Sequence, residues 1–179
     1  VGCSHLLQAA CHNADARGKR ALYLPLDMLG HFPPDILEEP ERLDLLAIDD
    51  LQLVVGRKRW EEALFHGFNR LRDAGKRLVI AADRSPRQLE VKLPDLASRL
   101  NWGMVFHAQP LNDTQRLAAL QLRAQVRGME LPAEVARYIL HRGPRQLDPL
   151  FEILSRLDRA SLSAKRKLTI PFVKQALEW

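Results

Sequence analysis

Leu43-Asp44-Leu45-Leu46-Ala47-Ile48-Asp49-Asp50 is a short apolar run that ends in two adjacent carboxylates. A run of this length, bounded by polar residues, predicts a strand that is buried on both faces of a sheet. Open parallel sheets bind ligands at the C-terminal ends of their strands, where Asp49 and Asp50 are expected. A strand that ends at a solvated acidic turn is the alternative explanation of the same residues.

Paired carboxylates at the end of a buried strand are typical of the Walker B motif of P-loop NTPases. The first carboxylate, here Asp49, holds a magnesium ion directly or through water. The second, here Asp50, orients or polarises a water molecule. The stretch therefore predicts one half of a site for a magnesium-bound nucleotide.

The N-terminal residues resemble the end of a phosphate-binding loop. Gly2 precedes Ser4 at the start of a helical pattern, as in the tail of GxxxxGK[ST]. In that motif the backbone N–H groups of the loop and helix bind phosphates, and the hydroxyl binds magnesium. The first glycine of the motif is absent from the sequence, and Cys3 stands where a lysine normally reaches the outer phosphates. A helix capped by Ser4 is the alternative.

Helical and strand patterns alternate along the first part of the chain. Helices are expected from Ser4 towards Gly18 and over residues 35–39, 57–74 and 96–102; strands are expected over residues 20–26, 43–50, 77–82 and 103–108. Such alternation predicts a parallel α/β sheet with right-handed crossovers.

The remainder of the chain shows helical patterns only. They cover residues 112–128, a segment opened by Pro132, residues 147–157, and a short piece from Ile170. We therefore expect a nucleotide-binding α/β domain over residues 1–110, with its N-terminal strand and part of its P-loop absent from the sequence, and a helical lid over residues 111–179.

Composition fits this organisation. A chain of 179 residues with 46% hydrophobic residues is large enough for one domain and a small appendage. A net charge of +5 and a pI near 9.6 permit contact with nucleic acid or an acidic protein without requiring it. The two cysteines show no CxxC spacing, and no apolar run has the length of a membrane span, so a cytoplasmic location without a membrane partner is expected.

The order of the motifs is specific. The P-loop remnant is followed by a strand ending Ile48-Asp49-Asp50, a strand ending Ala82-Asp83-Arg84, the segment Ser98–Gly103, and a lid that contains Arg145. This order resembles the AAA+ domain of the bacterial DnaA family. Three stretches, residues 93–103, 157–161 and 166–174, are similar to Hda, the DnaA-related group of regulators. The resemblance extends over essentially the whole chain and implies an α/β AAA+ P-loop fold with a C-terminal all-helical lid.

The resemblance also implies roles for single residues. Ser4 and Asp49 are implied to hold the magnesium ion of the nucleotide. The residues implied to bind the nucleotide are Gly2, Cys3, Ser4, His5, Asp49, Asp50, Asp83 and Arg145. Within this set Asp83 lies where sensor 1 contacts the outer phosphate, and Arg145 resembles the sensor 2 arginine of the lid. The alternatives are a surface pair of Asp83 with Arg84, and Arg145 as one of several lid arginines.

Arg99 lies where the family places an arginine finger, which is catalytic in trans on a neighbouring subunit's nucleotide. A guanidinium is always charged and presents planar donors, so it can stabilise phosphate charge on another chain. We expect Arg99 to be largely exposed and without a buried carboxylate partner of its own; a solvated helix charge is the alternative.

The implied function is inactivation of the replication initiator DnaA. The chain would hold ADP (or ATP) with Mg²⁺, bind the DNA polymerase III sliding clamp through an N-terminal segment absent from the sequence, and stimulate hydrolysis of DnaA-bound ATP, which prevents re-initiation. DNA and a second copy of the chain are further candidate partners. Cys3 disfavours efficient hydrolysis by the chain itself, and Pro149 is expected to kink or delay the helix that follows Arg145. A self-sufficient ATPase resembling a helicase loader, and a truncated DnaA fragment, are the alternatives.

Overall fold

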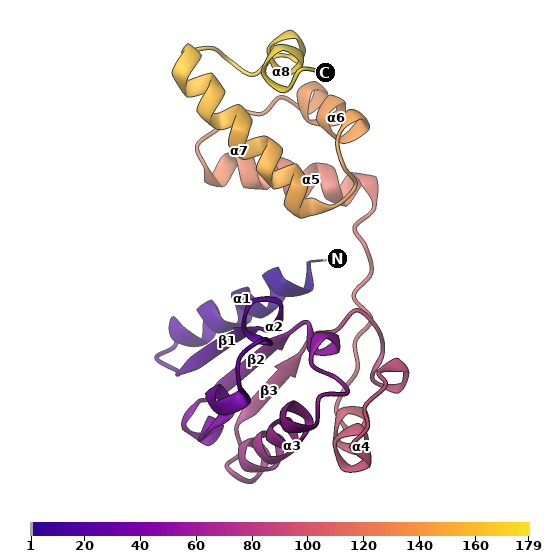
Figure 1. Cartoon of the computed structure of the whole chain (residues 1–179). Coiled ribbons are helices and arrows are strands. Elements are labelled where there is room, and N and C mark those ends of the chain that lie inside the picture. Colours follow the sequence, from indigo (N-terminus) through magenta and orange to yellow (C-terminus); the bar gives the residue numbers. More distant parts are fainter. Residues whose placement is uncertain (1) are drawn as a thin grey trace. The chain divides into compact units, whose positions relative to one another are not determined.

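The computed structural model describes residues 2–179, which form two compact units, residues 2–108 and 109–179. In the described chain the first unit contains a three-stranded sheet flanked by helices, and the second contains helices alone (Figure 1).

The sheet consists of the parallel strands β1 (Ala21–Pro25), β2 (Leu45–Asp49) and β3 (Arg77–Ile80), in that order. Because β2 lies between the other two strands, all five of its residues are buried, as its apolar sequence predicts. The register pairs Pro25 with Asp49, so the C-terminal ends of β1 and β2 meet at one edge. The predicted parallel α/β sheet is confirmed.

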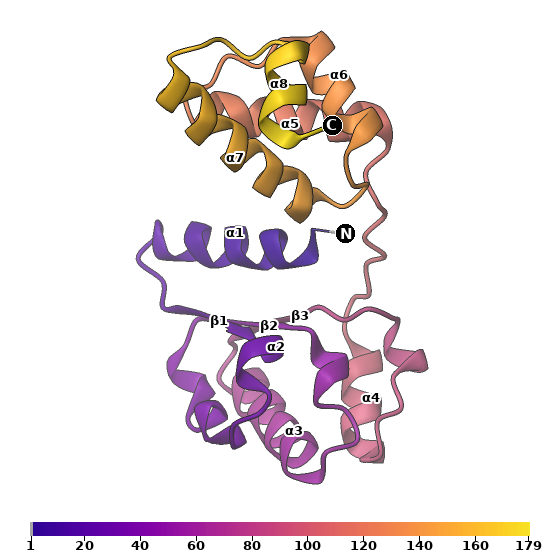
Figure 2. The same cartoon turned by 45° about the horizontal axis from the view of Figure 1, so that its top comes forward.

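Helices cover both faces of this sheet. Helix α1 (Cys3–Asp15) lies on one face, and α2 (Leu26–Leu29) and α3 (Lys58–Asp73) lie on the other, where α4 (Pro94–Trp102) packs against α3 (Figure 2). The predicted helices of this unit are thereby confirmed at residues 3–15, 58–73 and 94–102.

Side chains alternate along β2 and serve both faces. Leu45 and Ala47 belong to the apolar cluster under α1, whereas Leu46 and Ile48 belong to the cluster under α3. This period of two is the geometry of an extended strand. The same alternation determines the face of the sheet to which the side chain of Asp49 points at the end of β2.

Short 3-10 turns connect the elements of the first unit: η1 (Pro34–Leu37), η2 (Pro40–Arg42), η3 (Leu51–Leu53) and η4 (Pro86–Gln88). The helix expected over residues 35–39 is only the single turn η1. It ends because Pro40 follows and offers no backbone N–H to continue a helix.

The strand expected over residues 103–108 is wrong. This segment is extended coil, and its apolar side chains are exposed: Met104 to 88% and Phe106 to 83%. Within residues 2–179 it pairs with no other strand, and Val79 on β3 is also 41% exposed. An apolar sequence suits a strand, but the ladder of hydrogen bonds requires a neighbour.

The second unit packs α5 (Asp113–Val126), α6 (Ala133–Arg142), α7 (Leu147–Ala164) and α8 (Ile170–Leu177) around one apolar core. Asn112 caps α5 by accepting a 2.8 Å hydrogen bond from the backbone N–H of Gln115. The predicted all-helical character of this part is confirmed. No helix of the described chain is both long and apolar enough to cross a membrane.

Candidate functional site

Asp49 is the last residue of β2 and is only 3% exposed. Its Oδ2 accepts a 2.8 Å hydrogen bond from the hydroxyl of Tyr23, and its Oδ1 accepts one of 3.1 Å from the backbone N–H of Asp50. A buried carboxylate needs such donors, since without them its desolvation would strongly disfavour the charge. The carboxylate is therefore an ordered part of the sheet edge.

Asp50 turns away from the strand in the left-handed region, with φ of 56°. Aspartate tolerates this conformation better than most residues. Its Oδ1 accepts a 2.8 Å hydrogen bond from the side-chain amide of Gln52. The two adjacent carboxylates thus have different partners, which suits two different tasks.

Gln52 connects Asp50 with the end of the neighbouring strand. Its Oε1 accepts a 3.2 Å hydrogen bond from the backbone N–H of Asp83, the position assigned to sensor 1. The Asp83 side chain forms a two-point ion pair with Arg84, at 2.7 and 2.8 Å, and this guanidinium lowers the pKa of the Asp83 carboxyl group. The surface pair considered from the sequence is therefore present, and Asp83 is also joined to the acidic edge.

Helix α1 begins at the same edge. Gly2 precedes it in the left-handed region, with φ of 92°, and no side chain caps the helix, so Ser4 is not its cap. The ring of Tyr23 packs in the apolar cluster under α1, and its hydroxyl donates to Asp49 at the end of β2. The structure therefore brings the Gly2–Ser4 turn, Asp49, Asp50 and Asp83 to one edge of the sheet.

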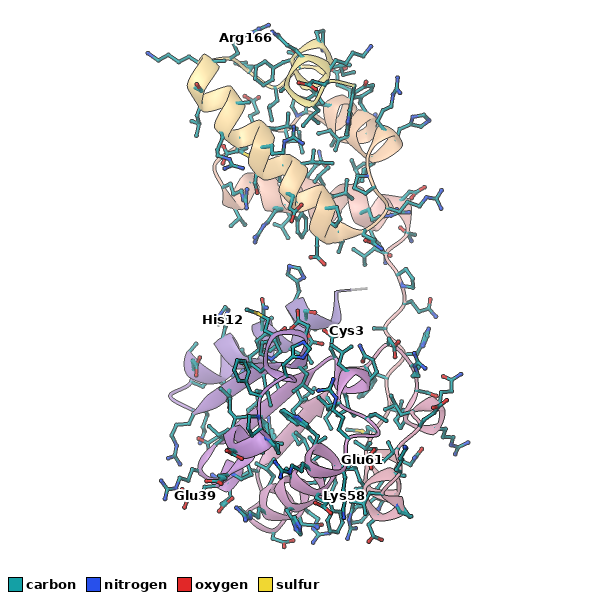
Figure 3. All side chains as sticks on the ribbon, viewed as in Figure 1. Cys3, His12, Glu39, Lys58, Glu61 and Arg166 are labelled. Carbon is teal, nitrogen blue, oxygen red and sulfur yellow. The ribbon has the colours of Figure 1, made fainter. Side chains whose placement is uncertain are left out.

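Cys3 is the first residue of α1 (Figure 3). It is partly buried, whereas His5 is exposed. The N-terminal turn of a helix presents backbone N–H groups that suit a phosphate. Ser4 and Asp49 add oxygen ligands of the kind that Mg²⁺ prefers, and Mg²⁺ in nucleotide sites completes its shell with phosphates and water. The residues present therefore fit a magnesium-bound nucleotide.

Arg99 lies in the last turn of α4. Its guanidinium carbon is 5.3 Å from the centre of the Trp102 ring, so the side chain is partly buried and the expectation of a largely exposed side chain is wrong. Sequence reasoning placed Trp102 at the end of the helix expected over residues 96–102 and missed this stacking. Among residues 2–179, no carboxylate forms an ion pair with Arg99.

Arg145 belongs to the helical unit and lies in the turn before α7. Its side chain is exposed, and its carbonyl accepts a 3.2 Å hydrogen bond from Arg116. Pro149 is the third residue of α7 and causes neither a kink nor a late start, because N–H groups of the first turn have no partner within a helix. The expected distortion after Arg145 is therefore wrong.

Sequence reasoning missed two residues that organise the site, Tyr23 and Gln52. It also missed Glu61, whose carboxylate accepts a hydrogen bond from the backbone N–H of Leu93, just before α4. Only Tyr23 carried a signal, because a tyrosine in a buried strand needs a partner for its hydroxyl. Burial and the hydrogen bond to Asp49 raise the pKa of the Tyr23 phenol, so it remains a neutral donor.

Comparisons with known proteins agree with this geometry. Residues 34–107 match the family model of the bacterial DnaA ATPase domain, and residues 113–177 match that of the Hda lid domain. The chain belongs to the Hda/DnaA family of AAA+ proteins. It is accordingly a DnaA-related replication protein with a DnaA-like AAA+ domain and an Hda-type lid.

Solved structures support the fold. Domain III of DnaA from Thermotoga maritima is 24% identical with a TM-score of 0.83, and the match covers 99% of this chain and 79% of that one. AMPPCP-bound DnaA from Aquifex aeolicus is 27% identical with a TM-score of 0.72, over 90% of this chain and 53% of that one. The branch migration motor RuvB from T. maritima, at 16% identity and a TM-score of 0.73, shares the fold alone; the match covers 99% of this chain and 58% of RuvB. The chain thus spans little more than half the length of the Aquifex DnaA and RuvB chains.

Proposed function

We propose that this Hda/DnaA-family protein switches off the initiator DnaA by stimulating hydrolysis of DnaA-bound ATP. The observation that carries the proposal is the state of Arg99. Its guanidinium stacks on an aromatic ring, and no carboxylate in the described chain neutralises its charge. An arginine whose orientation is fixed and whose charge is not neutralised can stabilise phosphate charge on another molecule.

In this proposal the chain's own site holds a nucleotide and does not turn it over efficiently. Gly2, Cys3, Ser4 and His5 would surround the phosphates, with Asp49, Asp50 and Asp83 at the strand ends and Arg145 contributed by the lid. Cys3 provides no positive charge for a third phosphate, so ADP would be held about as well as ATP. The AMPPCP found in Aquifex DnaA supports nucleotide binding at a site of this kind.

The partners follow from the same proposal. ATP-bound DnaA would present its nucleotide to Arg99, and a sliding clamp of DNA polymerase III would bring the two proteins together on DNA. DNA itself is a further partner, because single-stranded DNA is bound by one DnaA structure similar to this chain and the lid is basic. Residues 109–179 contain twelve Lys or Arg and seven Asp or Glu, so the net charge of +5 lies in the lid.

A self-sufficient motor is the rival function, and Cys3 is the observation against it. An ATPase assay with purified components distinguishes the proposed regulator from the motor. ATP turnover is measured for this protein alone, for DnaA alone, and for both together with clamp loaded on DNA, using protein expressed from its complete coding sequence. We expect turnover to rise only in the mixture; steady turnover by this protein alone would instead support the motor.

A further inference from the structure

Trp102, the last residue of α4, is an exposed aromatic side chain beside Arg99. It is 66% exposed, and in the described chain it belongs to none of the apolar core clusters. The ring therefore adds little to the packing of the fold. It contacts the guanidinium of Arg99, whose central carbon lies 5.3 Å from the centre of the ring. The role of this ring is thus to be sought outside the core.

The contact follows from helical geometry. Arg99 and Trp102 are three residues apart, so one turn of α4 brings their side chains to the same side of the helix. A guanidinium within about 6 Å of a ring centre is attracted by the negative face of the π system. The ring carries no net charge, so the attraction orients Arg99 and leaves its positive charge available, whereas a carboxylate would neutralise that charge.

The helix that carries this pair is anchored to the first unit. Leu96, one turn before Arg99, is 2% exposed and belongs to the core cluster under α3. The hydrogen bond from the backbone N–H of Leu93 to Glu61 holds the start of the helix. A guanidinium that lies on a ring of an anchored helix keeps a defined direction, unlike a long side chain that is free in solvent.

We propose that Trp102 is a positioning residue that holds Arg99 ready for a phosphate group on another molecule. This inference rests on the proposed function and deepens it. A free arginine side chain loses rotamer entropy when it is fixed against a nucleotide. An arginine that already lies on a ring loses less, and its charge is in place when charge develops in the transition state. Trp102 should therefore affect the rate of hydrolysis and not the docking of the two proteins.

The test measures hydrolysis of DnaA-bound ATP at increasing concentrations of this protein, expressed from its complete coding sequence, with clamp loaded on DNA. Trp102→Leu keeps an apolar side chain and removes the aromatic face. It should lower the maximal rate about tenfold, as expected for a lost cation–π contact, and leave the half-maximal concentration within about twofold. Trp102→Phe retains an aromatic face and should recover most of the maximal rate.

Three outcomes would overturn the role of Trp102. The first is a maximal rate of Trp102→Leu that equals or exceeds that of the wild type; an excess would mean that the ring holds Arg99 away from the partner. The second is an unchanged maximal rate with a raised half-maximal concentration, which would make Trp102 a docking residue. The third is an equal loss in Trp102→Leu and Trp102→Phe, because the aromatic face would then be irrelevant.

Phe32 offers a matched control in the first unit. It is an aromatic side chain that is 63% exposed, and no cation lies over its ring within the described chain. Phe32→Leu should leave both kinetic parameters unchanged. Absence of stimulation by the wild-type protein would contradict the proposed function itself. Equal stimulation by the wild type and by Trp102→Leu would contradict only the inference about Trp102.

The contact can also be measured without DnaA. In the NMR spectrum of this protein alone, the ring current of Trp102 should shift the side-chain Nε–H resonance of Arg99, which is assigned by its absence in Arg99→Ala. Trp102→Leu should move this resonance to the range of other exposed arginines, and Trp102→Phe should move it less. A resonance that does not change in Trp102→Leu would show that the ring does not hold Arg99 in solution.

Discussion

Oε2 of Glu61 accepts a 2.8 Å hydrogen bond from the backbone N–H of Leu93, the residue that precedes α4. The same carboxylate accepts from the backbone N–H groups of Gly56 and Lys92, at 2.7 and 3.1 Å. Glu61 lies on α3 and is 2% exposed. It therefore ties the start of the helix that carries Arg99 to the body of the first unit (Figure 3).

Glu61→Gln should lower the free energy of unfolding by about 1–3 kcal/mol, because an amide offers one acceptor oxygen where the carboxylate offers two. Denaturant unfolding measures the change. Glu62→Gln is the matched control on the same helix, since Glu62 forms only a 3.9 Å ion pair with Lys58 and its side chain is 48% exposed. It should change stability by no more than about 0.5 kcal/mol. Equal effects of the two variants would contradict the role given to Glu61.

Asp44 makes a pH-dependent contribution to the stability of the fold at the other edge of the sheet. It accepts from the backbone N–H of Arg20 at 3.0 Å and from the ammonium of Lys76 at 2.8 Å, and these bonds, that of Lys76 first, lower its pKa to about 2. Because the folded pKa is depressed, the stabilisation is complete above the ordinary carboxyl value of 3.8 and is lost as pH falls through about 2.

Asp44→Asn should therefore destabilise the protein at pH 7, with the difference from the wild type shrinking between about pH 4 and pH 2. Urea unfolding at a series of pH values measures this difference. A difference of the same size at pH 2 and pH 7 would show that the charge of Asp44 contributes nothing.

Cys3→Lys should restore a preference for the triphosphate. The lysine ammonium would reach the outer phosphates from the first turn of α1, so ATP should gain about tenfold over ADP. In the wild type the two nucleotides should bind with similar affinity. Calorimetry with both nucleotides tests this, and Cys3→Met, which adds length without charge, should leave the ratio near one. A strong ATP preference in the wild type would contradict the assignment of Cys3.

Arg145→Ala should weaken ADP binding about tenfold if the lid arginine contacts a phosphate. Arg142→Ala is the control, because Arg142 is also an exposed lid arginine and lies three residues earlier, at the end of α6. Fluorescent-ADP titration compares the two variants. Equal affinities would favour the view that Arg145 is an ordinary surface charge.

The sheet and its acidic edge were predictable because their signal is local. The apolar run before Asp49 is buried on both faces, and the spacing of apolar residues in α3 matches one helical face. Residues 103–108 show the limit of such patterns. Their sequence is apolar enough for a strand, but pairing depends on a neighbour that composition does not specify.

The contacts that shape the site were not predictable for a related reason. Tyr23 meets Asp49 only because β1 and β2 pair in one register, and Glu61 meets Leu93 across a sequence separation of 32 residues. Polar partners that approach through tertiary packing leave no periodic pattern in the sequence. Arg99 and Trp102 are close in sequence, but their contact depends on the conformations of the two side chains, which spacing alone does not predict.

Arg99 provides the most direct test of the proposed function. The measurement is turnover of DnaA-bound ATP in the presence of DNA-loaded clamp and either wild-type or variant protein. Arg99→Ala should abolish the stimulation, since arginine fingers contribute roughly 10³–10⁵ in rate in well-studied NTPases. Arg99→Lys should also fail to stimulate hydrolysis, because an ammonium lacks the planar set of donors that a guanidinium presents. Both variants should retain folding and ADP binding; near-normal stimulation by Arg99→Ala would contradict the account.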